Sequence, residues 1–205
     1  ILACNTASAM ALRTIQQNDL QAINPSRRVL GIIRPTAECI GQLTTSRHVG
    51  IVATPGTIKS ESYKLEISKL FPDITVTGEA CPMWVPLVEN YEFDSPGADY
   101  FVKKRINNLL RKDHEIDAII LGCTHYPLLI NKILKYVPAG VKIIPQGEYV
   151  ANSLKEYFVR HPEMENQCTH GGKCLYMTTE SPEKFKESAQ MFLHEQVEVN
   201  HIDLE

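Results

Sequence analysis

Short apolar runs alternate with amphipathic stretches along the whole chain, and this alternation constrains the fold more than any other feature. The apolar runs have the length of strands, whereas the stretches between them have the apolar spacing of helices. The predicted strands are Ile1–Ala3, Val29–Ile33, Val49–Ala53, Ile74–Thr77, Ala118–Leu121, Val141–Ile144, Cys174–Met177 and Val197–His201. The predicted helices are Ala7–Gln17, Ala37–Leu43, Ile58–Leu70, Pro82–Glu89, Ala98–Arg111, Leu128–Tyr136, Glu148–Val159 and Pro182–Leu193. This order predicts an α/β protein with mostly parallel sheets flanked by helices.

Composition narrows the range of functions. The chain has 205 residues, of which 43% are hydrophobic and 22% are charged. This length and this hydrophobic fraction are sufficient for a buried core. A net charge of -3 with scattered Lys and Arg gives no reason to expect nucleic acid or an anionic membrane as partner. No apolar run approaches the roughly 18–20 residues of a membrane span. The six cysteines are sparse for a chain of this length, so we expect reduced thiols in the cytoplasm.

Two cysteines occupy matching local frames 119 positions apart (123 − 4). Cys4 ends one apolar run, Cys123 ends another, and each is followed by a polar pair and a segment that can be helical. A run of this kind is the carboxyl end of a buried parallel strand, where open α/β sheets place their chemistry. Two thiols placed this way could face one substrate from opposite sides. That geometry suits an enzyme that removes a proton from one face of a carbon and returns it to the other.

Each cysteine also has a structural interpretation. A helix N-terminus favours the thiolate of Cys4, and Asn5 and Thr6 offer an amide and a hydroxyl to a ligand. On this motif alone, a small buried cysteine beside a capping residue is the favoured interpretation. For Cys123 the functional interpretation is favoured, because Thr124 adds a hydroxyl and His125 titrates near neutrality. The alternative there is a structural cysteine with a capping threonine and a surface histidine.

The segments Ala3–Ala7 and Leu121–Leu129 resemble the two signature segments of the bacterial glutamate racemase family. That family belongs to the cofactor-independent aspartate/glutamate racemase superfamily. The segment Val52–Ser60 with Tyr63, the segment Ala80–Glu89 and the segment from Tyr176 to Phe185 are similar to further parts of the family pattern. The resemblance therefore covers nearly the whole chain.

The resemblance implies two pseudo-symmetric α/β domains with the substrate in the crevice between them. One domain comprises residues 1–28 and 137–205, and the other comprises residues 29–136. The chain has no initiator Met, and the family's opening Asp-Ser-Gly-type and Tyr-Gly loops have no counterpart in it. We therefore expect the first domain to lack its N-terminal strands and the substrate pocket to be incomplete. Thr36 stands where the family commonly has Gly.

The resemblance also implies the chemistry, which is interconversion of L- and D-glutamate for peptidoglycan synthesis. It makes Cys4 and Cys123 the two acid/base residues, with His125, supported by Glu89, assisting Cys123. The residues that it implies for substrate binding are Asn5, Thr6, Thr54, Thr57, Thr124 and His125. It implies no pyridoxal phosphate, other cofactor or metal. It also suggests a homodimer and, by family analogy only, binding to DNA gyrase.

Other functions stay open at this point. An aspartate or hydantoin racemase of the same superfamily is the nearest alternative, and a catalytically dead fragment that acts as a binding protein is another. A thiol redox protein is disfavoured because the chain has no Cys-x-x-Cys motif. Cys39 and Cys81 are expected to pack in the interior. Cys168 and Cys174 are expected in a surface loop rather than in a metal site, since no second ligand pair accompanies them.

Overall fold

The computed structural model describes residues 1–204, and its chain divides into two compact units, Ile1–Tyr157 and Phe158–Glu205. The predicted α/β class, with parallel sheets flanked by helices, is confirmed. The division predicted from the sequence, with one domain of residues 1–28 and 137–205 and another of residues 29–136, stays a prediction.

The larger unit is built on one four-stranded sheet. Its strands are β1 His48–Ala53, β2 Thr75–Ala80, β3 Ala118–Gly122 and β4 Lys142–Ile144. Its helices are α1 Asn5–Met10, α2 Leu12–Thr14, the π-helix η1 Ile15–Asp19, α3 Leu20–Ile23, α4 Ile33–Leu43, α5 Pro55–Lys59, α6 Ser62–Leu70, α7 Trp84–Glu89, α8 Pro96–Lys112, the 3-10 helix η2 Tyr126–Leu129 and α9 Ile130–Tyr136. Helix α10, Gly147–Arg160, begins in this unit and ends in the next.

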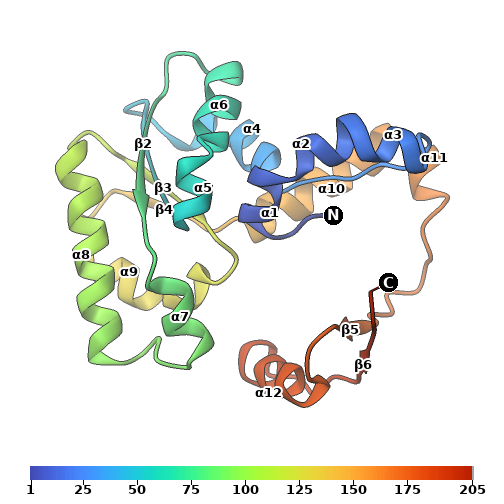
Figure 1. Cartoon of the computed structure of the whole chain (residues 1–205). Helices are drawn as coiled ribbons and strands as arrows, with labels where there is room; N and C mark the ends of the chain where they lie inside the picture. Colours follow the sequence, from blue (N-terminus) through green and yellow to red (C-terminus); the bar gives the residue numbers. More distant parts are fainter. Residues whose placement is uncertain (205) are drawn as a thin grey trace. The chain divides into compact units, whose positions relative to one another are not determined.

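The sheet has the order β2-β1-β3-β4 with every pair parallel. Helices α4 and α6 lie on one side of it and helices α8 and α9 on the other (Figure 1). Both faces of the central strands are therefore buried, which explains why β1 and β3 are almost wholly aliphatic. The core on the first side includes Ile40 of α4 and Ile67 of α6, and α8 contributes the fully buried Ile106 on the other side.

The smaller unit is a short βαβ motif. It contains α11 Pro162–Glu165, β5 Tyr176–Thr178, α12 Pro182–Leu193 and β6 Val199–His201, and the two strands pair in parallel. Helix α12 has the predicted bounds because Ser181 caps it and accepts a hydrogen bond from the Lys184 backbone N–H at 3.3 Å. Helix α11 lies between the predicted helix Glu148–Val159 and the predicted strand Cys174–Met177, where the sequence predicted no helix.

Two predicted strands, Ile1–Ala3 and Val29–Ile33, are wrong. The described residues place only a single parallel bridge there, between Leu2 and Gly31, and Ile33 already begins α4. Apolar sequence alone does not make a strand, because a strand is stabilised by pairing along its length. Within the described part of the chain these two segments pair only with each other.

The predicted helix Ile58–Leu70 is also interrupted. Helix α5 ends at Lys59, and α6 begins at Ser62 after Glu61, whose φ of 54° lies in the left-handed region. A residue in that region cannot continue a right-handed helix. The break turns α6 so that Tyr63 and Ile67 face the core.

None of the helices among residues 1–204 combines the length and the apolar character needed to cross a membrane.

Candidate active site

The carboxyl ends of the four parallel strands meet along one edge of the sheet, and each leads into a polar or thiol side chain. Thr54 follows β1, Cys81 follows β2, Cys123 follows β3, and Gln146 lies two residues after β4. Open α/β sheets bind their ligands beyond this edge. The candidate site is therefore built from four strand ends that are far apart in the sequence.

Strand β3 delivers Cys123 to this edge in a closely packed position. The preceding Gly122 lies against β1, where an added Cβ would stand 3.0 Å from the Ala53 Cβ and 3.2 Å from the Val52 carbonyl oxygen. Only glycine fits there without displacing a neighbour. Cys123, the next residue, is only 7% exposed.

The surroundings of Cys123 keep its thiol protonated. Burial raises the pKa of Cys123, the backbone hydrogen bond of His125 lowers it, and negative charges on Cys4 and Glu89 raise it again. The net effect is a pKa above the ordinary value of a cysteine, so Cys123 rests as the thiol.

Cys4 directly precedes the first residue of α1. It is the N-cap of α1, with extended backbone angles (φ −81°, ψ 127°), and its side chain is exposed. A charge on its sulfur affects the pKa of Cys123, so the two thiols lie within electrostatic reach of each other. The fold thus brings together the two cysteines that the sequence singled out, both within the larger unit.

A hollow of about 230 Å³ lies beside Cys123. Its lining includes Ala3, which precedes Cys4, together with Thr124 and Gln146. Thr124 is exposed and offers its hydroxyl at the rim. The hollow has room for a small ligand.

Three threonines form a cluster of hydroxyls between α1 and the end of β1. The Thr6 Oγ1 lies 2.8 Å from the Thr54 Oγ1 and 3.2 Å from the Thr57 Oγ1, and the last two lie 3.1 Å apart. Thr54 also caps α5 by accepting from the Thr57 backbone N–H at 3.3 Å. All three are residues that the sequence assigned to substrate binding. Their binding role stays a prediction, and their proximity is a finding.

A chain of contacts runs from Cys123 to the molecular surface. The Cys123 Sγ lies 3.8 Å from the His125 Nδ1, and the His125 Nε2 lies 3.1 Å from the Glu89 Oε1. The carboxylate side chain is well exposed and the imidazole is partly exposed. The structure thus brings His125 and Glu89, the two residues that the family resemblance grouped around Cys123, close to it.

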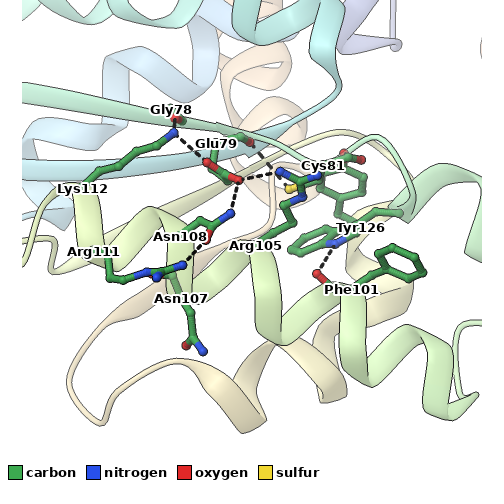
Figure 2. A network of polar contacts seen from close by, with 11 residues as sticks. Gly78, Glu79, Cys81, Phe101, Arg105, Asn107, Asn108, Arg111, Lys112 and Tyr126 are labelled. Atoms are coloured by element: carbon green, nitrogen blue, oxygen red, sulfur yellow. Dashed lines mark hydrogen bonds and ion pairs between the residues drawn. The ribbon is translucent and has the colours of Figure 1, made fainter.

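The loop after Cys123 is tied to the end of β2. The Tyr126 hydroxyl donates to the Cys81 carbonyl at 3.2 Å, and the Tyr126 and Trp84 rings meet edge to face with centroids 4.8 Å apart. Figure 2 shows Tyr126 and Cys81 beside the polar network of Glu79. Cys81 is buried, as the sequence predicted.

The Glu79 network fastens α8 to β2 (Figure 2). The Glu79 Oε2 lies 2.6 Å from the Lys112 Nζ, and the Oε1 lies 3.0 Å from the Arg105 Nη1 and 3.3 Å from the Asn108 Nδ2. Burial raises the pKa of Glu79, but these three donors outweigh burial and hold the pKa below its ordinary value. The buried carboxylate is therefore ionised and satisfied.

Asn5 does not face open solvent. It is 2% exposed, its Oδ1 accepts from the Tyr63 hydroxyl at 2.5 Å, and its Nδ2 donates to the Gln146 Oε1 at 2.7 Å. The predicted role of Asn5 in substrate binding stays a prediction. Sequence reasoning missed Gln146, although a polar residue just beyond a predicted strand, Val141–Ile144, was the available signal.

Among the described residues, one group has the composition of a metal site: His48, Asp113 and Glu115. It lies at the start of β1, at the opposite edge of the sheet from Cys123. The His48 Nδ1 lies 2.9 Å from Asp113 and its Nε2 lies 3.2 Å from Glu115. Both ring nitrogens therefore already have a carboxylate partner, which is the arrangement of an ion pair.

The parallel sheet, with Cys123 beside a hollow at its carboxyl edge, defines an α/β protein with a candidate active site in the usual place for this fold. Residues 1–154 match the family model described as Asp/Glu/Hydantoin racemase, and the chain belongs to this family of amino-acid racemases, which are isomerases.

Individual relatives agree with that assignment. A glutamate racemase from Streptococcus agalactiae serotype III (strain NEM316) is 38% identical over 208 residues, which cover 100% of this chain and 74% of the relative. The crystal structure of glutamate racemase isoform RacE1 from Bacillus anthracis superposes with a TM-score of 0.85 at 32% identity, covering 98% of this chain and 72% of that one. A glutamate racemase from Francisella tularensis in complex with D-glutamate gives a TM-score of 0.80 at 28% identity, covering 98% and 71%.

Proposed function

We propose that this chain interconverts L- and D-glutamate without a cofactor, with Cys4 and Cys123 as the acid/base pair. The observation that carries the proposal is that Cys123 lines a hollow together with Ala3, the residue before Cys4, and that the charge of Cys4 reaches Cys123. The similarity to glutamate racemases over the whole chain supports glutamate as the substrate.

In the proposed reaction, one sulfur acts as thiolate and takes the α-proton of the bound amino acid. The electron pair of the broken C–H bond stays on the α-carbon and is delocalised into the carboxylate. The thiol on the opposite face then gives its proton to that carbon, which inverts the configuration. At the end the negative charge has moved from one sulfur to the other, so the reverse reaction uses the same groups with their roles exchanged.

The α-proton of an amino acid is very weakly acidic, so the site must stabilise the developing carbanion. The proposed donors to the substrate carboxylate and amino group are Asn5, Thr124 and the hydroxyl cluster of Thr6, Thr54 and Thr57. Hydroxyls whose positions are already set by one another need little reorganisation when the charge develops.

We propose that His125 moves the proton of Cys123. When its Nε2–H donates to Glu89, its Nδ1 is left as an acceptor that faces the Cys123 thiol. Glu89 then selects the tautomer and stabilises the imidazolium that forms. This would generate the thiolate of a cysteine whose burial otherwise keeps it protonated.

The proposed product, D-glutamate, would serve peptidoglycan synthesis in the cytoplasm, and this role rests on family likeness alone. Assembly as a homodimer and binding to DNA gyrase likewise stay predictions.

The test is exchange of the α-proton in D2O, followed by NMR on L- and D-glutamate without pyridoxal phosphate. It is run on the 205-residue chain and, in parallel, on the whole product of its gene. We expect deuterium uptake and racemisation, with Cys4→Ala and Cys123→Ala each lowering racemisation by at least about a hundredfold. Uptake into aspartate or a substituted hydantoin alone would assign the chain to another racemase of the family. No uptake into any of them would overturn the proposal and favour a binding role, which both alanine variants should retain.

A further inference from the structure

A closed ring of hydrogen bonds lies beneath the candidate site. The Asn5 Nδ2 donates to the Gln146 Oε1 at 2.7 Å, the Gln146 Nε2 donates to the Tyr63 hydroxyl, and the Tyr63 hydroxyl donates to the Asn5 Oδ1 at 2.5 Å. These three residues are between 2% and 7% exposed. Each member donates one hydrogen bond within the ring and accepts one, so all three hydrogen bonds run in the same direction around it.

A residue outside the ring, Thr36, fixes the direction of these hydrogen bonds. The Thr36 hydroxyl, which is fully buried, donates its only hydrogen to the Ile32 carbonyl at 3.0 Å. It can therefore only accept from Gln146, at 2.8 Å, and this contact requires the Nε2 of Gln146 to face it. Once Gln146 is oriented, its Oε1 must face Asn5. Burial raises the pKa of Tyr63 far above its ordinary value, so the tyrosine keeps the proton that it donates.

The ring joins parts of the fold that no single element connects. Asn5 is the first residue of α1 and directly follows Cys4. Tyr63 belongs to α6, and Gln146 lies between β4 and α10. Gln146 also lines the hollow beside Cys123. Its side chain therefore contacts the support of one thiol while lying next to the other.

We propose that Gln146 is a positioning residue for the reaction, because through Asn5 and Tyr63 it sets where α1 presents Cys4 relative to Cys123. The inference rests on the proposed racemase function. A reacting group that is misplaced by about 1 Å can lose a hundredfold in rate. Cys123, by contrast, directly follows β3, which is held in the sheet by backbone pairing with β1 and β4. Opening the ring should therefore disturb one thiol and leave the other in place.

The test uses variants that open the ring and keep the interior filled. Gln146→Met replaces the amide by an unbranched apolar side chain of similar length, and Tyr63→Phe removes one hydroxyl only. Tyr136→Phe is the matched control, since it also removes a tyrosine hydroxyl that bonds a side chain, Asp99 at 2.7 Å, but on α9. Folding of each variant is checked by circular dichroism and thermal unfolding. If Gln146→Met does not fold, the smaller change in Tyr63→Phe still tests the inference.

We expect kcat to fall about 10- to 100-fold in Gln146→Met and in Tyr63→Phe, with KM changed less than about threefold. The kcat of the double variant should be no lower than that of the less active single variant, because both changes open the same ring. The control should stay within about twofold of the parent protein.

A second readout separates positioning from a general loss of structure. With Cys4 misplaced and Cys123 in place, one of the two glutamate enantiomers should still exchange its α-proton for deuterium while its inversion falls. The ratio of exchange to inversion should rise for that enantiomer alone. A purely structural role of Gln146 would lower the rates of exchange and inversion by the same factor, and it would do so for both glutamate enantiomers.

The outcomes distinguish the two proposals. If the parent gene product neither exchanges nor racemises any substrate, the proposed function has failed. If the parent racemises and the folded ring variants keep their kcat within about twofold, or lose exchange and inversion equally, then Gln146 has no positioning role. A lowered kcat with an enantiomer-specific rise in the ratio supports the inference.

Discussion

The hydroxyls of Thr6 and Thr54 lie 2.8 Å apart although the residues are 48 positions apart in the sequence. This contact joins the first turn after Cys4 to the end of β1, so the segment that carries one thiol is held against the sheet that carries the other. The contact is direct and partly buried, which makes it sensitive to the loss of a single hydroxyl.

Loss of these hydroxyls should weaken both stability and catalysis. Thr6→Val removes one member of the cluster and should lower the free energy of unfolding by about 1 kcal/mol. Thr54→Val also removes the cap of α5, which costs about 1 kcal/mol by itself. Urea unfolding and racemase kinetics measure the two effects, with the exposed Thr45→Val as control. Unchanged activity in both cluster variants would argue against a role of the hydroxyls in binding.

The thiol of Cys123 should react slowly with alkylating reagents near neutral pH. Its pKa lies above the ordinary value, chiefly through burial, and the charge of Glu89 contributes to the rise. Glu89→Gln should therefore move the midpoint of the pH–alkylation curve at Cys123 downward, and Glu92→Gln should not. Iodoacetamide labelling followed by peptide mass spectrometry gives the curve for each cysteine separately. A midpoint below the ordinary cysteine value in the parent protein would contradict the burial seen here.

The Glu79 network should stabilise the fold in a way that depends on pH. Glu79→Gln leaves Lys112 and Arg105 without their carboxylate and should lower the free energy of unfolding by about 2–3 kcal/mol at pH 7. The folded pKa is lowered, so the contribution is fully present above the unfolded value of about 4.3 and is lost as the pH falls through the folded pKa.

The measurement is urea unfolding of both proteins across acidic pH, where the difference between them should shrink. Glu38→Gln is the matched control, because it removes an exposed ion pair with Arg34 and should change stability by less than about 0.5 kcal/mol. A difference between parent and Glu79→Gln that stays constant down to pH 2 would rule out the ionised carboxylate as its source.

Gly122 should not tolerate a side chain. A Cβ at this position would meet Ala53 and the Val52 carbonyl at distances that require β1 or β3 to shift. Gly122→Ala should therefore lower the free energy of unfolding by about 1–3 kcal/mol and also reduce activity, since Cys123 is the next residue. Gly97→Ala, in the first turn of α8 with only an ordinary contact, should be neutral or slightly stabilising. Thermal unfolding and kinetics compare the two.

Much of this architecture was predictable because it depends on local pattern. The aliphatic runs of β1 and β3 are long enough to predict buried strands. Ser181 followed by Pro182 predicts the start of α12. The placement of Cys123 just beyond a strand follows from the same pattern. The failures arose where pairing or backbone conformation decided the outcome, as at the isolated bridge of Leu2 and at the left-handed Glu61.

The sequence by itself determined the alternation of strands and helices, the position of both thiols at the ends of apolar runs, and the resemblance to a racemase family. Only the tertiary structure decided that Asn5 is buried and that Gln146 orients it, because a hydrogen bond between residues 141 positions apart leaves no periodic signal in a single sequence. The raised pKa of Cys123 was likewise decided by the fold, since it arises from burial and from charges on Cys4 and Glu89 that the sheet and its loops bring near.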